Sequence, residues 1–164
     1  MEEKQTRNLY QLIEIKETIV GNLAMDEKIL KVLVNQGENA LALSAPAPKT
    51  VMHKNIHPKK RAPKLLLVDQ GNIGITVGAV GNDDGYFRKY SIVFYVTFPE
   101  TMSYLMVDGL RVCREDYLAH LIDLNFDKAR GYGIGKMKFG AIRDLEAPDG
   151  FEGVALYYES VDFA

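Results

Sequence analysis

Apolar residues in the first part of the chain recur every three to four positions, a pattern typical of amphipathic helices. The first stretch predicts a helix that Thr6 can cap and that ends near Gly21 and Asn22. The second predicts a helix that begins at the N-cap Asp26 and ends at Gly37. The two apolar stripes are Leu9, Leu12, Ile13, Ile19 and Val20, and Ile29, Leu30, Leu33 and Val34. We expect a helical hairpin over residues 6–37 that packs on the rest of the chain, because helices this short are marginal alone.

The middle of the chain changes from a proline-rich segment to strand-like patterns. Residues 40–64 contain four prolines and predict an extended, partly ordered connector that is better suited to an exposed arm than to a core. Strands are predicted at 65–68, 73–80 and 90–98, with a turn at 82–85 joining the last two. In the third strand, alternation places one apolar set on a single face: Tyr90, Ile92, Phe94, Val96 and Phe98.

The C-terminal part returns to helical periodicity and then to strands. Residues 109–125 predict a helix with Cys113 on its apolar stripe and Arg114 on its polar side. Strands are predicted at 132–139 and 151–158. The order of elements therefore indicates an α+β fold, with an N-terminal helical hairpin and a largely antiparallel sheet covered by helices.

Length and composition are those of one ordinary globular domain. The chain has 164 residues, of which 47% are apolar and 26% charged, so a wholly disordered chain is excluded. We expect a single domain over 1–164, made of a helical part at 6–37, a basic connector at 40–64 and an α+β core at 65–164. No apolar run exceeds five residues, whereas a membrane-spanning helix needs about 20, so no membrane association is expected. The N-terminus does not resemble a signal peptide, and a single cysteine excludes an intrachain disulfide.

Charge is distributed unevenly, although the net charge is only −2. Between Glu38 and Asp69 there are six basic residues and no acid; after Arg143 there are six acids and no base. We interpret the two stretches as complementary subunit-interface surfaces. The residues expected at this interface are Lys54, Lys59, Lys60, Arg61, Lys64, Glu146, Asp149 and Glu152. Two other interpretations stay open: two solvated surfaces, or nucleic-acid contact through 49–64, which has no aromatic residues for base stacking.

Motifs for catalysis or metal binding are incomplete. The glycine-rich run 131–136 lacks the first glycine and the hydroxyl residue of a phosphate-binding loop. His53 and His57 stand four apart without a third ligand, and Cys113 has no base nearer than His120, two helical turns away. Three carboxylates at helical spacing are interpreted as a solvated helix face: Asp116, Asp123 and Asp127. We therefore expect no enzymatic activity, no metal and no cofactor.

The C-terminal half resembles a known group of proteins. The residues that carry the resemblance are Leu110 to Val112, Asp116 to Leu118, Leu121 to Asp123, Gly133 to Met137, Gly153 to Tyr158 and Val161 to Phe163. Together with the strand 90–98 and Pro99, they resemble bacteriophage proteins of the head–tail junction, described as tail terminator, tail completion or neck proteins. The resemblance covers roughly residues 86–164.

The resemblance implies a non-enzymatic virion protein that forms a ring and caps the tail tube. The expected partners are further copies of the chain and tail-tube or neck proteins. The expected location is the cytoplasm of the bacterial host during assembly and then the virion tail. The alternative is a small nucleic-acid-binding accessory protein that uses the basic segment 49–64.

Overall fold

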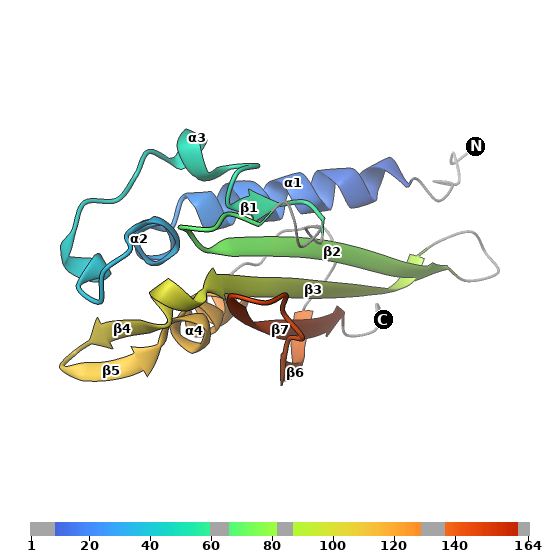
Figure 1. The fold of residues 1–164 in the computed structure, drawn as a ribbon. Coiled ribbons are helices and arrows are strands. Elements are labelled where there is room, and N and C mark those ends of the chain that lie inside the picture. Colours follow the sequence, from blue (N-terminus) through green and yellow to red (C-terminus); the bar gives the residue numbers. More distant parts are fainter. Residues whose placement is uncertain (1–8, 60–65, 82–86, 129–136, 161–164) are drawn as a thin grey trace, which may run out of the picture.

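The fold is built on a five-stranded sheet, seen in the computed structural model, which describes residues 9–59, 66–81, 87–128 and 137–160 (Figure 1). The strand order is β1 (Ile56–His57), β2 (Asn72–Gly81), β3 (Phe87–Pro99), β7 (Phe151–Ser160) and β6 (Met137–Asp144). Only β1 and β2 are parallel; the other neighbours are antiparallel. The predicted α+β class with a largely antiparallel sheet is therefore confirmed.

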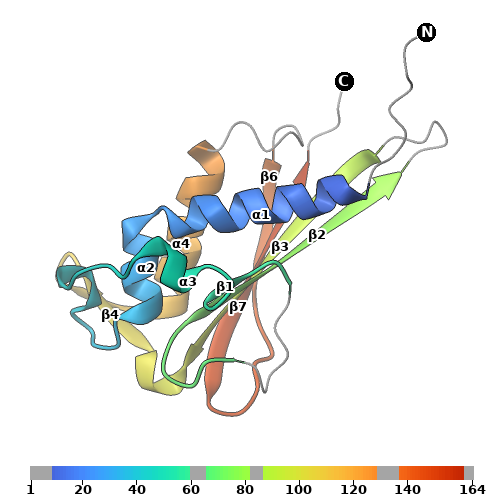
Figure 2. The ribbon, with the colours of Figure 1, turned by 90° about the horizontal axis from the view of Figure 1, so that it is seen from above.

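Helices cover the apolar face of this sheet. They are α1 (Tyr10–Ala24), α2 (Glu27–Val34), the one-turn α3 (Pro48–Val51) and α4 (Arg114–Lys128), with short 3-10 helices at Ala40–Ala42 and Glu100–Met102. A separate two-stranded hairpin consists of β4 (Tyr104–Val107) and β5 (Leu110–Cys113). Figure 2 shows α1 crossing over the long strands β2 and β3, with α2 and α4 to one side.

The predicted apolar face of β3 forms the centre of the core. Its five alternating residues, from Tyr90 to Phe98, are all buried. Phe94 makes edge-to-face contacts with Phe126 of α4 and Tyr158 of β7, with ring centroids 5.0 and 5.8 Å apart. The sheet and α4 are thus joined through an aromatic cluster.

The N-terminal helices form largely as their sequence predicts, with different ends. α1 continues through Gly21 and Asn22 to Ala24, because the buried residues Leu23 and Ala24 extend its apolar face; Thr6 lies outside the described residues. Asp26 caps α2, since its carboxylate accepts hydrogen bonds from the backbone N–H groups of the second and third helical residues. α2 ends at Val34, earlier than predicted. Figure 1 looks along α2 while α1 lies across the view, so the chain turns sharply between them.

The prediction of an exposed arm is wrong for residues 40–59, which pack against the body of the protein. Val51 of α3 and Ile56 of β1 are both buried in the core. The predicted strand at 65–68 is also wrong for the described residues 66–68, where Val68 is 77% exposed. The strand order of the sheet accordingly contains no element from this segment.

The predicted helix at 109–125 is correct only from Arg114 onward. Residues 110–113 form β5 of the hairpin instead. Asp108 and Gly109 connect the two strands with positive φ angles of 50° and 82°, the backbone geometry of a two-residue hairpin turn. This turn places Cys113 on an exposed strand, not on a buried helix face.

Candidate functional site

Basic side chains gather around the edge strand β1. Lys49 lies on α3, Lys54 in the turn before β1 and Lys59 just after it, and all three are exposed. We call these three residues the basic edge. None of the ion pairs between described residues involves them. The other three predicted basic residues lie outside the described part of the chain: Lys60, Arg61 and Lys64.

Acidic side chains gather around the opposite edge of the sheet, near β6. Asp144 ends β6, Glu146 and Asp149 lie in the loop between β6 and β7, and Glu152 lies near the start of β7; all four are exposed. We call these four residues the acidic edge. A tight turn holds the loop, in which Phe151 N–H donates to the Pro148 carbonyl at 3.0 Å.

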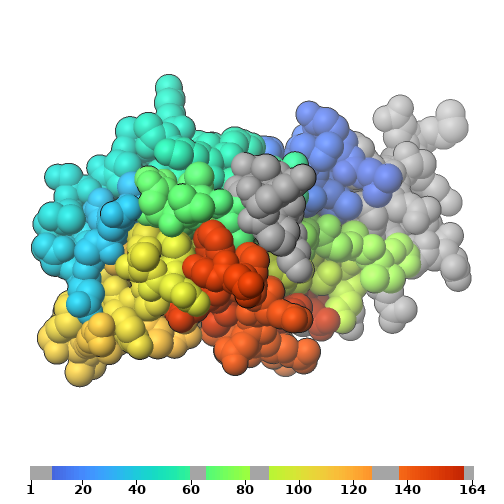
Figure 3. All heavy atoms as spheres, viewed as in Figure 1, coloured from blue at the N-terminus to red at the C-terminus, as the bar shows by residue number. Residues whose placement is uncertain are grey.

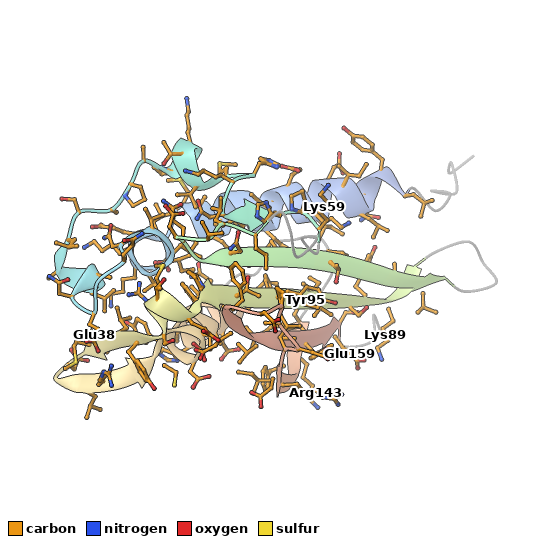
Figure 4. All side chains as sticks on the ribbon, in the orientation of Figure 1. Glu38, Lys59, Lys89, Tyr95, Arg143 and Glu159 are labelled. Carbon is orange, nitrogen blue, oxygen red and sulfur yellow. The ribbon has the colours of Figure 1, made fainter. Side chains whose placement is uncertain are left out.

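The two charged edges lie on opposite sides of the molecule. β1 is the first strand of the sheet and β6 the last, with three strands between them. In Figure 4, Lys59 is labelled on the upper side of the sheet, while Arg143, next to the acidic edge, is labelled at the bottom. One chain therefore cannot pair its own basic edge with its own acidic edge. A further acid of the C-terminal stretch, Glu159, already pairs with Lys89 at 2.9 Å.

A hollow of about 380 Å³ lies between the β4–β5 hairpin, the start of α4 and the acidic edge. We call it the acidic hollow; the lining residues that matter below are Tyr104, Cys113, Glu115, Asp144, Phe151 and Glu152. Figure 3 shows the yellow atoms of the hairpin beside the orange-red atoms of the β6–β7 loop.

Glu115 is a partly buried carboxyl group of the hollow, whereas Asp144 and Glu152 are exposed. Its Oε2 atom is buried and has no hydrogen-bond partner among the described residues. Burial raises the pKa of Glu115, and the negative charges of Glu152, Asp116 and Asp144 raise it further. The hollow is therefore a place where negative charge accumulates without a compensating cation in the described part of the chain.

Cys113 shares this electrostatic environment. Although the residue is exposed, neighbouring atoms partly desolvate its thiol; this desolvation raises the pKa of the thiol, and the charges of Glu115, Asp116 and Glu152 add to the effect. A thiol with a raised pKa is a poor nucleophile at neutral pH.

Arg114 was predicted on a polar helix surface, and that prediction is wrong. It is fully buried. Its guanidinium donates five hydrogen bonds of 2.6–3.3 Å to the backbone carbonyls of Val32, Asn35, Gln36, Gly37 and Tyr104. Burial lowers the pKa of Arg114 to about 10, and Glu38 opposes this shift. Because four of these carbonyls end α2 or follow it, Arg114 fixes the hairpin and α4 to the end of that helix.

The residues considered for catalysis or metal binding are not brought together. His53 is exposed, with its Nε2 atom 3.1 Å from Oε2 of Glu17, whereas His57 is buried in β1. Asp123, predicted to be solvated, accepts a hydrogen bond of 2.7 Å from the Tyr158 hydroxyl. Among the described residues, no three His, Cys, Asp or Glu side chains are close enough to hold a metal ion. The glycine-rich run 131–136 lies outside those residues.

No helix within the described ranges is both long and apolar enough to cross a membrane.

Comparison with protein families assigns the chain to a known family. The YomW family model matches residues 26–160, which is most of the chain. The chain belongs to the YomW family. This family derives from Bacillus phages and prophages, so membership indicates a phage-associated protein. The YomW match includes α2, β1, the hairpin and the acidic hollow, and no curated protein or solved structure matches the chain.

Sequence reasoning missed Tyr104 and Glu115 as parts of the hollow. Glu115 was predicted on a helix, which is correct, but its neighbours come from β4, β6 and β7. The one local signal available was the dipeptide Asp108-Gly109, which is typical of a hairpin turn and would have predicted the β4–β5 hairpin.

Proposed function

We propose that this member of the YomW family is a structural protein of the virion that acts at the head–tail junction, in a tail terminator, completion or neck role. It functions by assembly, in which copies associate with one another in a ring and bind tail-tube or neck proteins. It carries out no catalysis and uses no cofactor. It is made in the cytoplasm of the bacterial host and ends in the virion tail.

The observation that supports this proposal best is the position of the two charged edges. Lysines border one edge strand of the sheet, and carboxylates lie at the end of the other edge strand and in the loop that follows it, so two copies can bring surfaces of opposite sign together. Contacts between two different surfaces of identical subunits are head-to-tail, and they close into a ring when the rotation between copies allows it.

The strength of this association is expected to be low in the isolated protein. Charge pairs at an exposed rim contribute only about 0.2–1 kcal/mol each. They therefore set the orientation and rate of association more than its affinity. A ring would become stable once the copies are also held by the end of the tail tube.

The proposed location can be tested in purified particles of the phage or prophage that encodes the chain. Antibody labelling in the electron microscope should place the protein at the junction of head and tail. Quantitative mass spectrometry of separated heads and tails should find it in the tail fraction. Absence from particles, or labelling spread over the capsid shell, would contradict the proposal.

One observation favours the nucleic-acid alternative. The basic edge presents three exposed lysines that no carboxylate among the described residues neutralises. If these lysines contact phosphate, DNA affinity should fall steeply with salt and drop when Lys54 and Lys59 are changed to Gln. We favour a protein partner for two reasons. Aromatic residues for base stacking are missing from 49–64. In addition, a protein that lines the passage of DNA should not bind that DNA tightly.

A further inference from the structure

We propose that the acidic hollow is the docking surface for the basic edge of a second copy of this chain, and that it receives a lysine side chain. The inference deepens the proposed function and rests on its head-to-tail association. It adds a specific docking site, the acidic hollow, which is formed by the hairpin and α4 as well as by the acidic edge.

The shape and lining of the hollow suit a lysine. Tyr104 and Phe151 supply aromatic wall, and the carboxylates of Glu115, Asp144 and Glu152 supply the charge. A lysine buries its aliphatic stem along apolar surface and keeps its ammonium group with polar partners. Arg111 lies over the Tyr104 ring, with its guanidinium carbon 3.8 Å from the ring centroid, but its charge is already paired with Glu38.

The electrostatics of the hollow favour an incoming cation. None of the ion pairs between described residues involves Glu115, Asp144 or Glu152. The buried Oε2 atom of Glu115 lacks a hydrogen-bond donor within the described ranges. Burial is the main cause of the raised pKa of Glu115, and repulsion from the neighbouring carboxylates adds to it. An ammonium group in the hollow would supply the missing positive charge.

The basic edge of another copy is the occupant that this geometry favours. Lys54 is exposed in the turn before β1, and Lys59 is exposed just after it, on the far side of the sheet from the hollow. The same chain therefore cannot fill its own hollow with these side chains. Nucleic acid is excluded as the occupant of this surface, since phosphate would be repelled by the same carboxylates.

The native cysteine allows a direct test. Cys113 lines the hollow and is the only cysteine of the chain. A short reagent that joins a thiol to an amine is applied to an equimolar mixture of unlabelled and ¹⁵N-labelled protein, and the products are mapped by mass spectrometry. We expect mixed-isotope products that join Cys113 to Lys54 or Lys59. Products between chains that avoid the basic edge, or products within one chain only, would overturn the proposal.

A pair of matched variants separates the hollow from general electrostatics. E115Q/E152Q neutralises two carboxylates of the hollow, and E146Q/D149N neutralises two acids outside it, so both variants change the net charge equally. We expect about a fivefold fall in interchain product for E115Q/E152Q and little change for E146Q/D149N. Yields are divided by the rate of simple thiol labelling, because removing carboxylates also lowers the pKa of Cys113. An equal fall in interchain product for the two variants would overturn the assignment of the acidic hollow as the docking site.

The possible failures of the two proposals can be told apart. If the protein lies at the head–tail junction but Cys113 joins no basic-edge lysine, the acidic hollow is not the docking site and the proposed location stands. If the cross-link forms and the protein is absent from particles, the association is real and the proposed function is wrong.

Discussion

Arg114 offers the most informative single perturbation of this fold. Its buried guanidinium joins α4 to the carbonyls that follow α2 and to the Tyr104 carbonyl of the hairpin. The substitution R114M keeps most of the side-chain volume and removes every donor. Five backbone carbonyls would then lose a charged hydrogen-bond partner inside the protein.

The expected cost follows from these contacts. A hydrogen bond to a charged group contributes roughly 1.5–3 kcal/mol, but five bonds to one guanidinium are not additive. The lowered pKa of Arg114, about 10, shows that burial already opposes its charged form. We therefore expect R114M to lower the free energy of unfolding by about 3–5 kcal/mol, a large part of the typical ~5–15 kcal/mol of a domain.

Urea unfolding followed by far-ultraviolet circular dichroism measures this loss. R114K should lie between wild type and R114M, because a lysine has at most three donors for the five carbonyls. R111M is the matched control: Arg111 lies three residues earlier, in β5 of the hairpin, but is exposed and paired with Glu38, so its loss should cost less than about 1 kcal/mol. An R114M variant within about 1 kcal/mol of wild type would refute the reasoning, because that is the level expected of the exposed control.

Two further substitutions test other parts of the account. The raised pKa of Glu115 means that the folded state favours its protonated form, so its contribution to stability is fully present below about pH 4.5 and is lost as the pH rises through the folded-state pKa. E115Q should therefore raise the free energy of unfolding at pH 7 by less than about 1 kcal/mol, seen as a slightly higher thermal midpoint, and the gain should vanish in acid; a loss at pH 7 would contradict this. In G153A the new Cβ would clash with the Val96 carbonyl oxygen, so calorimetry should show that the free energy of unfolding falls by about 1–3 kcal/mol. G21A is its control, since nothing lies within 4 Å of that Cβ and alanine favours the α1 helix; a stabilising G153A would refute the packing argument.

The parts of the fold that sequence predicts well are those fixed by local chemistry. The N-cap of α2 follows from the side chain of Asp26, which bonds to backbone groups two and three residues away. The buried face of β3 follows from strict alternation in a strand with neighbours on both sides. In both cases, residues close in sequence decide the outcome.

The parts that sequence does not predict depend on distant contacts. Arginine is usually found on the surface. Only the carbonyls that follow α2, far away in the sequence, make the burial of Arg114 favourable. β1 consists of two residues whose parallel pairing with β2 has no local signature. The acidic hollow is likewise formed by the hairpin, α4 and the β6–β7 loop. The acidic stretch in the sequence therefore indicated negative charge but not a hollow.

Restoration of assembly by exchanged charges tests head-to-tail association most directly. A phage or prophage lacking the gene is complemented with K54E/K59E, with E146K/E152K, or with all four changes in one chain, and joined heads and tails are counted in the electron microscope. The account predicts that each double reversal lowers the number of complete particles and that the fourfold exchange partly restores it, because opposite signs again face each other between copies. Normal assembly by K54E/K59E, or a loss of salt-dependent DNA affinity without any restoration by the exchange, would contradict the account.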